Sequence, residues 1–211
     1  MGKLKRAGVA VLVATAVLLG IWWTDGRPPW PWPAGSQREG TVKVIRMDRH
    51  GTGIHIGHGL FLTAAHVADG DDAIVLKTAL GRSAGAERLW LNGDYDVALL
   101  RAADLKGIGA VPLSCRMPRI GEAVEAVGHP GVDEFVHSFG RVSSRAQKRG
   151  AWHESVIIDL TVLPGMSGGP VLDAAGNLIG IMVAVQTFGF AVARFGYVVP
   201  GAAICPLLAR N

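Results

Sequence analysis

The chain has 211 residues, of which 49% are hydrophobic and 18% charged, with two cysteines and a formal net charge of +4. This apolar content excludes a disordered chain, and two cysteines cannot carry the framework of a disulfide-stapled mini-protein. Residues 1–40 hold five basic and two acidic residues, a net of +3, which leaves +1 for the rest. The larger part of the chain is therefore nearly neutral, and no nucleic-acid partner is expected.

The N-terminal region predicts a membrane anchor followed by a spacer. Residues 7–23 carry no charge and would form a helix of about 25 Å, near the lower limit for a ~30 Å hydrocarbon core. Three basic residues precede this run and two tryptophans close it, which favours a cytoplasmic N-terminus. Residues 1–23 thus predict a signal-anchor transmembrane helix, and residues 24–40 a Pro/Trp-rich linker. A cleaved signal peptide is the alternative, although bulky residues stand where small ones are expected.

From residue 41 onward the apolar runs are short and separated by turn residues, which indicates an all-β protein. A break at residues 105–121 predicts a link between two halves, and residues 202–210 predict a short closing helix. The expected strands are 42–47, 53–56, 60–63, 73–78, 89–91, 97–101, 123–128, 135–143, 155–160, 170–172, 178–185 and 196–199.

Three motifs occur in one order along this region. His66 follows an apolar strand, Asp96 precedes another, and Ser167 lies in the segment Gly165-Met166-Ser167-Gly168-Gly169. A serine hydroxyl becomes a nucleophile when histidine accepts its proton, and a carboxylate holds that histidine in the required tautomer. The N–H groups of Gly165 and Ser167 are the natural donors to an oxyanion. The three motifs together predict a Ser-His-Asp triad.

These motifs resemble those of the trypsin-like (chymotrypsin-fold) serine peptidases, nearest to the bacterial HtrA-type branch, but without room for its PDZ domain. The resemblance covers about residues 51–199 and includes Gly128-His129-Pro130. It implies two six-stranded β-barrels, about 41–112 and 118–200, within a protease domain at 41–211. By position, His66 is the base, Asp96 rather than Asp94 its orienting acid, and Ser167 the nucleophile.

The implied protein is a serine endopeptidase on the bacterial inner membrane, crossing it once, with its protease domain in the periplasm. It would be secreted if the N-terminal segment is cleaved. Protein or peptide substrates are expected, with no cofactor and no metal. An esterase of the α/β-hydrolase type is excluded, because every histidine precedes Ser167 whereas that fold needs one after the serine. A membrane-tethered pseudoprotease that only binds peptides is the alternative.

The resemblance also places a substrate pocket, with Thr161 at its base. The opposite wall would consist of Val183, Ala184, Val185 and Gln186. None of these residues is acidic, so we expect cleavage after small or medium apolar residues rather than after Lys or Arg.

Two further pairs of side chains are of types that bind metals or form disulfides. His55 and His58 flank a turn and point to opposite faces of an extended strand, which predicts solvated histidines rather than a metal site. Cys115 and Cys205 could form a disulfide if the domain is extracytoplasmic, and two buried free thiols are the alternative.

Overall fold

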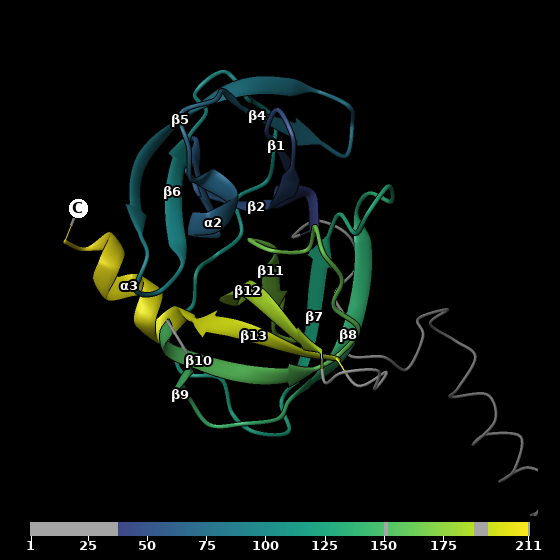
Figure 1. Cartoon of the computed structure of the whole chain (residues 1–211), viewed down its shortest axis with the longest axis vertical. Coiled ribbons are helices and arrows are strands. Elements are labelled where there is room, and N and C mark those ends of the chain that lie inside the picture. The colour runs from purple at the N-terminus through teal and green to yellow at the C-terminus, as the bar shows by residue number, and fades with distance from the viewer. Residues whose placement is uncertain (1–37, 150–151, 188–193, 211) are drawn as a thin grey trace, which may run out of the picture. The chain divides into compact units, whose positions relative to one another are not determined.

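The computed structural model describes residues 38–149, 152–187 and 194–210, in which two β-barrels are packed together (Figure 1). The predicted transmembrane helix lies outside the described residues. Within the part of the chain that the structure describes, no helix is both long and apolar enough to cross a bilayer.

The first barrel begins after a single 3-10 turn, η1 (Arg38–Gly40), and is closed by six antiparallel strands in the order β1-β2-β3-β6-β5-β4. β4 alternates between buried and half-buried residues, with Ile74 and Leu76 facing the core, whereas β3 and β6 are buried along most of their length. A four-residue helix, α2 (Ala65–Ala68), follows β3 directly. The strands are β1 (Thr41–Ile45), β2 (His50–Gly57), β3 (Leu60–Thr63), β4 (Ile74–Thr78), β5 (Ser83–Asn92) and β6 (Val97–Arg101).

The second barrel contains six strands in the order β13-β12-β11-β7-β8-β10, closed by pairing of β13 with β10. A seventh short strand, β9 (Gln147–Arg149), pairs only with β10. The strands are β7 (Ala123–Gly128), β8 (Val136–Val142), β10 (Trp152–Asp159), β11 (Pro170–Leu172), β12 (Leu178–Thr187) and β13 (Arg194–Pro200). Helix α3 (Gly201–Leu208) follows β13.

The two barrels share buried apolar surface. The core of the first barrel continues into Leu172, Leu178 and Ile181 of the second barrel and into Ile204 of α3. Because hydrophobic burial stabilises in proportion to the area removed from water, this continuity fixes the second barrel against the first.

The two-barrel prediction is confirmed, and β3, β6, β7 and β11 have the predicted limits. β5 is longer than the predicted 89–91; none of its residues is buried, and the polar residues in its first half gave no strand pattern. β9 was missed because it contains no apolar residue.

The prediction of two solvated histidines was wrong for His55, which is buried. Its Nδ1 donates to Gly109 O (3.2 Å), and its Nε2 accepts from the Gly59 N–H (3.3 Å). His58 is exposed, at a positive φ of 54°.

Candidate active site

His66 and Asp96 meet at the end of the first barrel. The Nδ1 atom of His66 lies 2.7 Å from Asp96 Oδ2, and the His66 backbone N–H donates to Oδ1 at 2.9 Å. Since a carboxylate can only accept, Nδ1 donates a proton to Asp96, and Nε2 makes no hydrogen bond with any of the described residues. The Asp96 side chain is 10% exposed and that of His66 is 50% exposed, so a substrate in solvent could reach the imidazole.

Asp96 is held by its own turn. It has a φ of +54°, a conformation that Asp tolerates better than most residues, and its carbonyl accepts from Ala65 N at 3.1 Å. The neighbouring Asp94 is turned to the second barrel instead, where its carbonyl accepts from His153 N at 2.8 Å. The structure therefore brings Asp96, and not Asp94, to His66.

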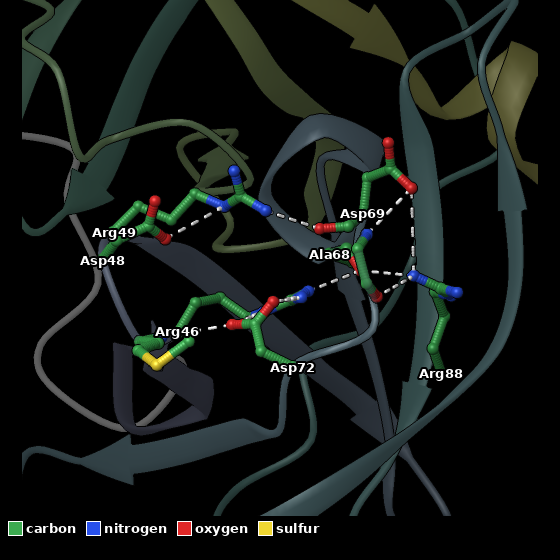
Figure 2. A network of polar contacts seen from close by, with 9 residues as sticks. Arg46, Asp48, Arg49, Ala68, Asp69, Asp72 and Arg88 are labelled. Atoms are coloured by element: carbon green, nitrogen blue, oxygen red, sulfur yellow. Dashed lines mark hydrogen bonds and ion pairs between the residues drawn. The ribbon is translucent and has the colours of Figure 1, made fainter.

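The end of α2 is surrounded by arginines (Figure 2). The last carbonyls of a helix lack partners within it, and here guanidinium groups supply them. The fully buried Arg46 side chain and Arg88 each donate to Ala68 O at 2.8 Å, and Arg49 donates to Asp69 O at 2.7 Å. Asp72 pairs with Arg46, whose hydrogen bond holds the pKa of that carboxyl well below its usual range. These bonds fix the segment that carries His66.

Ser167 lies in a loop that both barrels hold. The Ser167 carbonyl accepts from Thr52 N in the first barrel at 2.8 Å, and the Gly168 N–H donates to Met182 O in the second at 2.7 Å. Gly168 has a φ of +81°, and a Cβ there would overlap Thr52 O and Thr63 Oγ1. Only glycine fits this crossing point between the barrels.

The N–H groups of Gly165 and Ser167 are available to a ligand. Within the described ranges, no residue accepts a hydrogen bond from either group. Gly165 has a φ of +98°, and a Cβ there would overlap His129 O. Two free, neighbouring backbone donors beside a serine are what an oxyanion hole requires.

Three residues beside this loop, Thr52, His50 and His129, were not among the predicted site residues. The Thr52 hydroxyl donates to Gly165 O at 2.8 Å, and His50 Nε2 lies 2.8 Å from His129 O. The histidines are 79 positions apart, so spacing gave no signal for their meeting; only the Gly128-His129-Pro130 motif pointed to this region.

The predicted pocket residues are spread over two segments. Thr161 is exposed after β10, and Val183 is buried in β12. The register between β12 and β13 shifts between Met182 and Ala184, so Val183 has no partner in β13. The side chains of Ala184, Val185 and Gln186 lie outside the described part of the chain. As to metals, no group of three or more His, Cys, Asp or Glu residues in the described ranges could hold an ion.

Cys115 and Cys205 form a disulfide, with 5.6 Å between their Cα atoms. This outcome decides between the two alternatives that the sequence left open. The bond joins the segment between the barrels to α3.

Two closed barrels, a His–Asp pair and a glycine-flanked serine with free backbone donors define the trypsin-like class of protein. A family model described as trypsin-like peptidase domain matches residues 51–181. This match takes in more than half of the chain, and the chain belongs to that family.

Curated relatives and solved structures confirm the resemblance to the HtrA branch. The putative serine protease HhoA of Synechocystis sp. is 29% identical over 160 residues, covering 70% of this chain and 41% of the relative. A probable periplasmic serine endoprotease, DegP-like, of Halomonas elongata is 33% identical over 127 residues, covering 58% and 26%. The chain thus spans less than half the length of these relatives.

Among solved structures, a variant of the HtrA-type protease AlgW with a tripeptide has a TM-score of 0.75 and 25% identity, covering 82% of this chain and 60% of the other. Rv3671c from M. tuberculosis, in an inactive form, has a TM-score of 0.71 and 22% identity, covering 82% and 87%. At this identity the second likeness shows the fold alone.

Proposed function

We propose that the chain is a serine endopeptidase in which Ser167, His66 and Asp96 form the catalytic triad. The observation that carries the proposal is the His66–Asp96 pair, in which Nδ1 is engaged by the carboxylate. The free N–H groups of Gly165 and Ser167 support it independently.

The reaction follows from these positions. Ser167 Oγ attacks the substrate carbonyl carbon while His66 Nε2 takes the hydroxyl proton, and Asp96 stabilises the resulting imidazolium. The negative charge on the carbonyl oxygen is met by the N–H groups of Gly165 and Ser167. The imidazolium then gives its proton to the leaving amine, which leaves an acyl-enzyme ester. Water, activated in the same way by His66, releases the acid and restores Ser167.

The test is labelling of the full-length chain with a fluorophosphonate, which reacts with activated serines. We expect the wild type to be labelled and Ser167→Ala not to be labelled. Ser83 is an exposed serine on β5, and Ser83→Ala should be labelled like the wild type. Equal labelling of wild type and Ser167→Ala would contradict the triad. Absence of labelling from all three would favour the peptide-binding pseudoprotease instead.

We further propose that residues 1–23 anchor the protein in the bacterial inner membrane, with residues 24–40 as the linker and the protease domain at 41–211 in the periplasm. The Cys115–Cys205 disulfide supports this side of the membrane, because such bonds persist in oxidising compartments. Alkaline carbonate extraction and protease digestion of intact spheroplasts test it. The protein should remain with the membrane and be digested from outside; release by carbonate would contradict the anchor.

The proposed substrates are unfolded or flexible protein segments, cleaved after small or medium apolar residues such as Val or Ala. The bound tripeptide of the AlgW structure supports peptide substrates in a related protein. The absence of any acidic residue among Thr161 and 183–186 supports the apolar preference. A peptide-library cleavage profile dominated by Arg or Glu before the cut bond would overturn it.

A further inference from the structure

Thr52 contacts the serine loop at two carbonyls. Its N–H donates to Ser167 O at 2.8 Å, and its hydroxyl donates to Gly165 O at 2.8 Å. The same hydroxyl oxygen lies 3.0 Å from His129 Nδ1. A hydroxyl has one proton, and a carbonyl can only accept, so the Thr52 proton belongs to Gly165 O. His129 must therefore donate from Nδ1–H to Thr52 Oγ1.

His129 is fixed in this orientation by its surroundings. It has no exposed surface, and its Nε2 is buried with no hydrogen-bond partner among the described residues. Burial lowers the pKa of His129 to about 4, so the imidazole is neutral at pH 7. The ring packs edge-on against Phe135, with centroids 4.4 Å apart, and His50 Nε2–H donates to the His129 carbonyl.

The loop that follows His129 is tied to the first barrel. Lys43 and Lys77 each place Nζ 2.9 Å from a Glu134 carboxylate oxygen. These three groups and His50 are the charged and titratable groups that act on the His129 imidazole. The hydrogen bond from His50 to the His129 carbonyl and the ion pairs of Glu134 thus hold the backbone at His129 and in the loop that follows it.

We propose that His129 is a positioning residue for the oxyanion hole, acting through the hydroxyl of Thr52 on Gly165. Gly165 is the one donor of the hole with no side chain to restrain it, and glycine backbones rotate at low cost. The chain of hydrogen bonds from His129 Nδ1–H through Thr52 to Gly165 O holds that residue with its N–H toward the reacting carbonyl. The inference rests on the proposed peptidase function and assigns to it two residues outside the triad.

The first test compares turnover of a peptide ester by matched variants of the full-length chain. The amide nitrogen of Asn is as many bonds from Cα as His Nδ1, so His129→Asn retains the donor, while His129→Leu removes it. Thr52→Ser retains the hydroxyl and Thr52→Val removes it. We expect kcat to fall about 10- to 100-fold in the Leu and Val variants, somewhat less than for direct removal of an oxyanion donor, with KM within about threefold of wild type. The Asn and Ser variants should stay within about threefold in both.

The donor-deleting variants could lose activity simply by unfolding, so each is also examined by thermal melting. Wild-type kcat in Leu and Val variants that remain folded would overturn the proposal. So would an equal loss in all four variants, or a loss confined to KM. Failure of the proposed function would be distinguished by fluorophosphonate labelling of the wild type that does not depend on Ser167.

A second test needs no activity. Nitrogen-15 NMR of the His129 ring should show a protonated Nδ1 and a bare Nε2 at pH 7. A proton on Nε2 instead would refute the inference, whatever the kinetics. In Thr52→Val, where the acceptor is absent, we expect this tautomer preference to weaken.

Discussion

The buried neutral imidazole of His129 should make the stability of the protein depend on pH. Its folded-state pKa of about 4 lies below the ordinary value of 6.5. As the pH falls, the unfolded chain therefore binds the proton first, and folding loses stability between pH 6.5 and 4. Above pH 6.5 the neutral ring makes its full contribution to the stability of the folded state. At pH 5 the linkage amounts to about 2 kcal/mol relative to pH 7.

The assay is urea unfolding at pH 7 and pH 5, with wild type and His129→Asn compared at each pH. Asparagine does not titrate in this range, so the variant should lose about 2 kcal/mol less than the wild type on acidification. The other carboxyl and histidine groups are common to both chains and cancel in the difference. His58→Asn, on the surface, is the matched control and should behave like the wild type. Equal losses for wild type and His129→Asn would refute the assignment of a buried neutral ring.

Three other predictions concern backbone, ion pair and disulfide. Gly165→Ala should reduce kcat at least 100-fold, because the alanine Cβ would overlap His129 O and displace the loop. The measurement is steady-state kinetics, and a wild-type kcat would contradict this prediction. Arg46→Met should lower Tm more than Arg49→Met, since only the Arg46 side chain is fully buried; equal shifts by calorimetry would refute it. Cys115→Ser should cost about 4–5 kcal/mol and remove the effect of reductant on urea unfolding; a wild type whose unfolding is unchanged by reductant would exclude the bond.

The sequence predicted the barrels because short apolar runs separated by turn residues are a local property. Residues 60–62 and 97–100 are such runs, and the strand limits predicted from them, 60–63 and 97–101, agree with β3 and β6. The prediction covered only residues 89–91 of β5, because the rest of this strand has no buried residue and can therefore carry polar side chains that do not resemble a strand. Local patterning thus reveals strands that have a buried face better than it reveals exposed ones.

The candidate site was predictable where residue type and chemistry agree. The order of the three motifs along the chain, rather than any one of them, predicted His66, Asp96 and Ser167, and the structure joins the first two directly. Thr52 and His129 were not predictable, because a threonine in a strand and a histidine before a proline have many ordinary roles. The role proposed for them depends on the hydrogen bond between Thr52 and His129, which lie 77 positions apart and meet only because the two barrels pack together.

The bond between Cys115 and Cys205 turns the second barrel into a covalent ring that includes Ser167. A single cut in the chain between these cysteines opens the ring without releasing a fragment, since both new ends remain attached through sulfur. A cut in the first barrel has no such safeguard, because non-covalent packing alone would hold the severed strand. Under the proposed peptidase function, a self-inflicted cut between these cysteines would leave both new ends attached, whereas a cut in the first barrel would not.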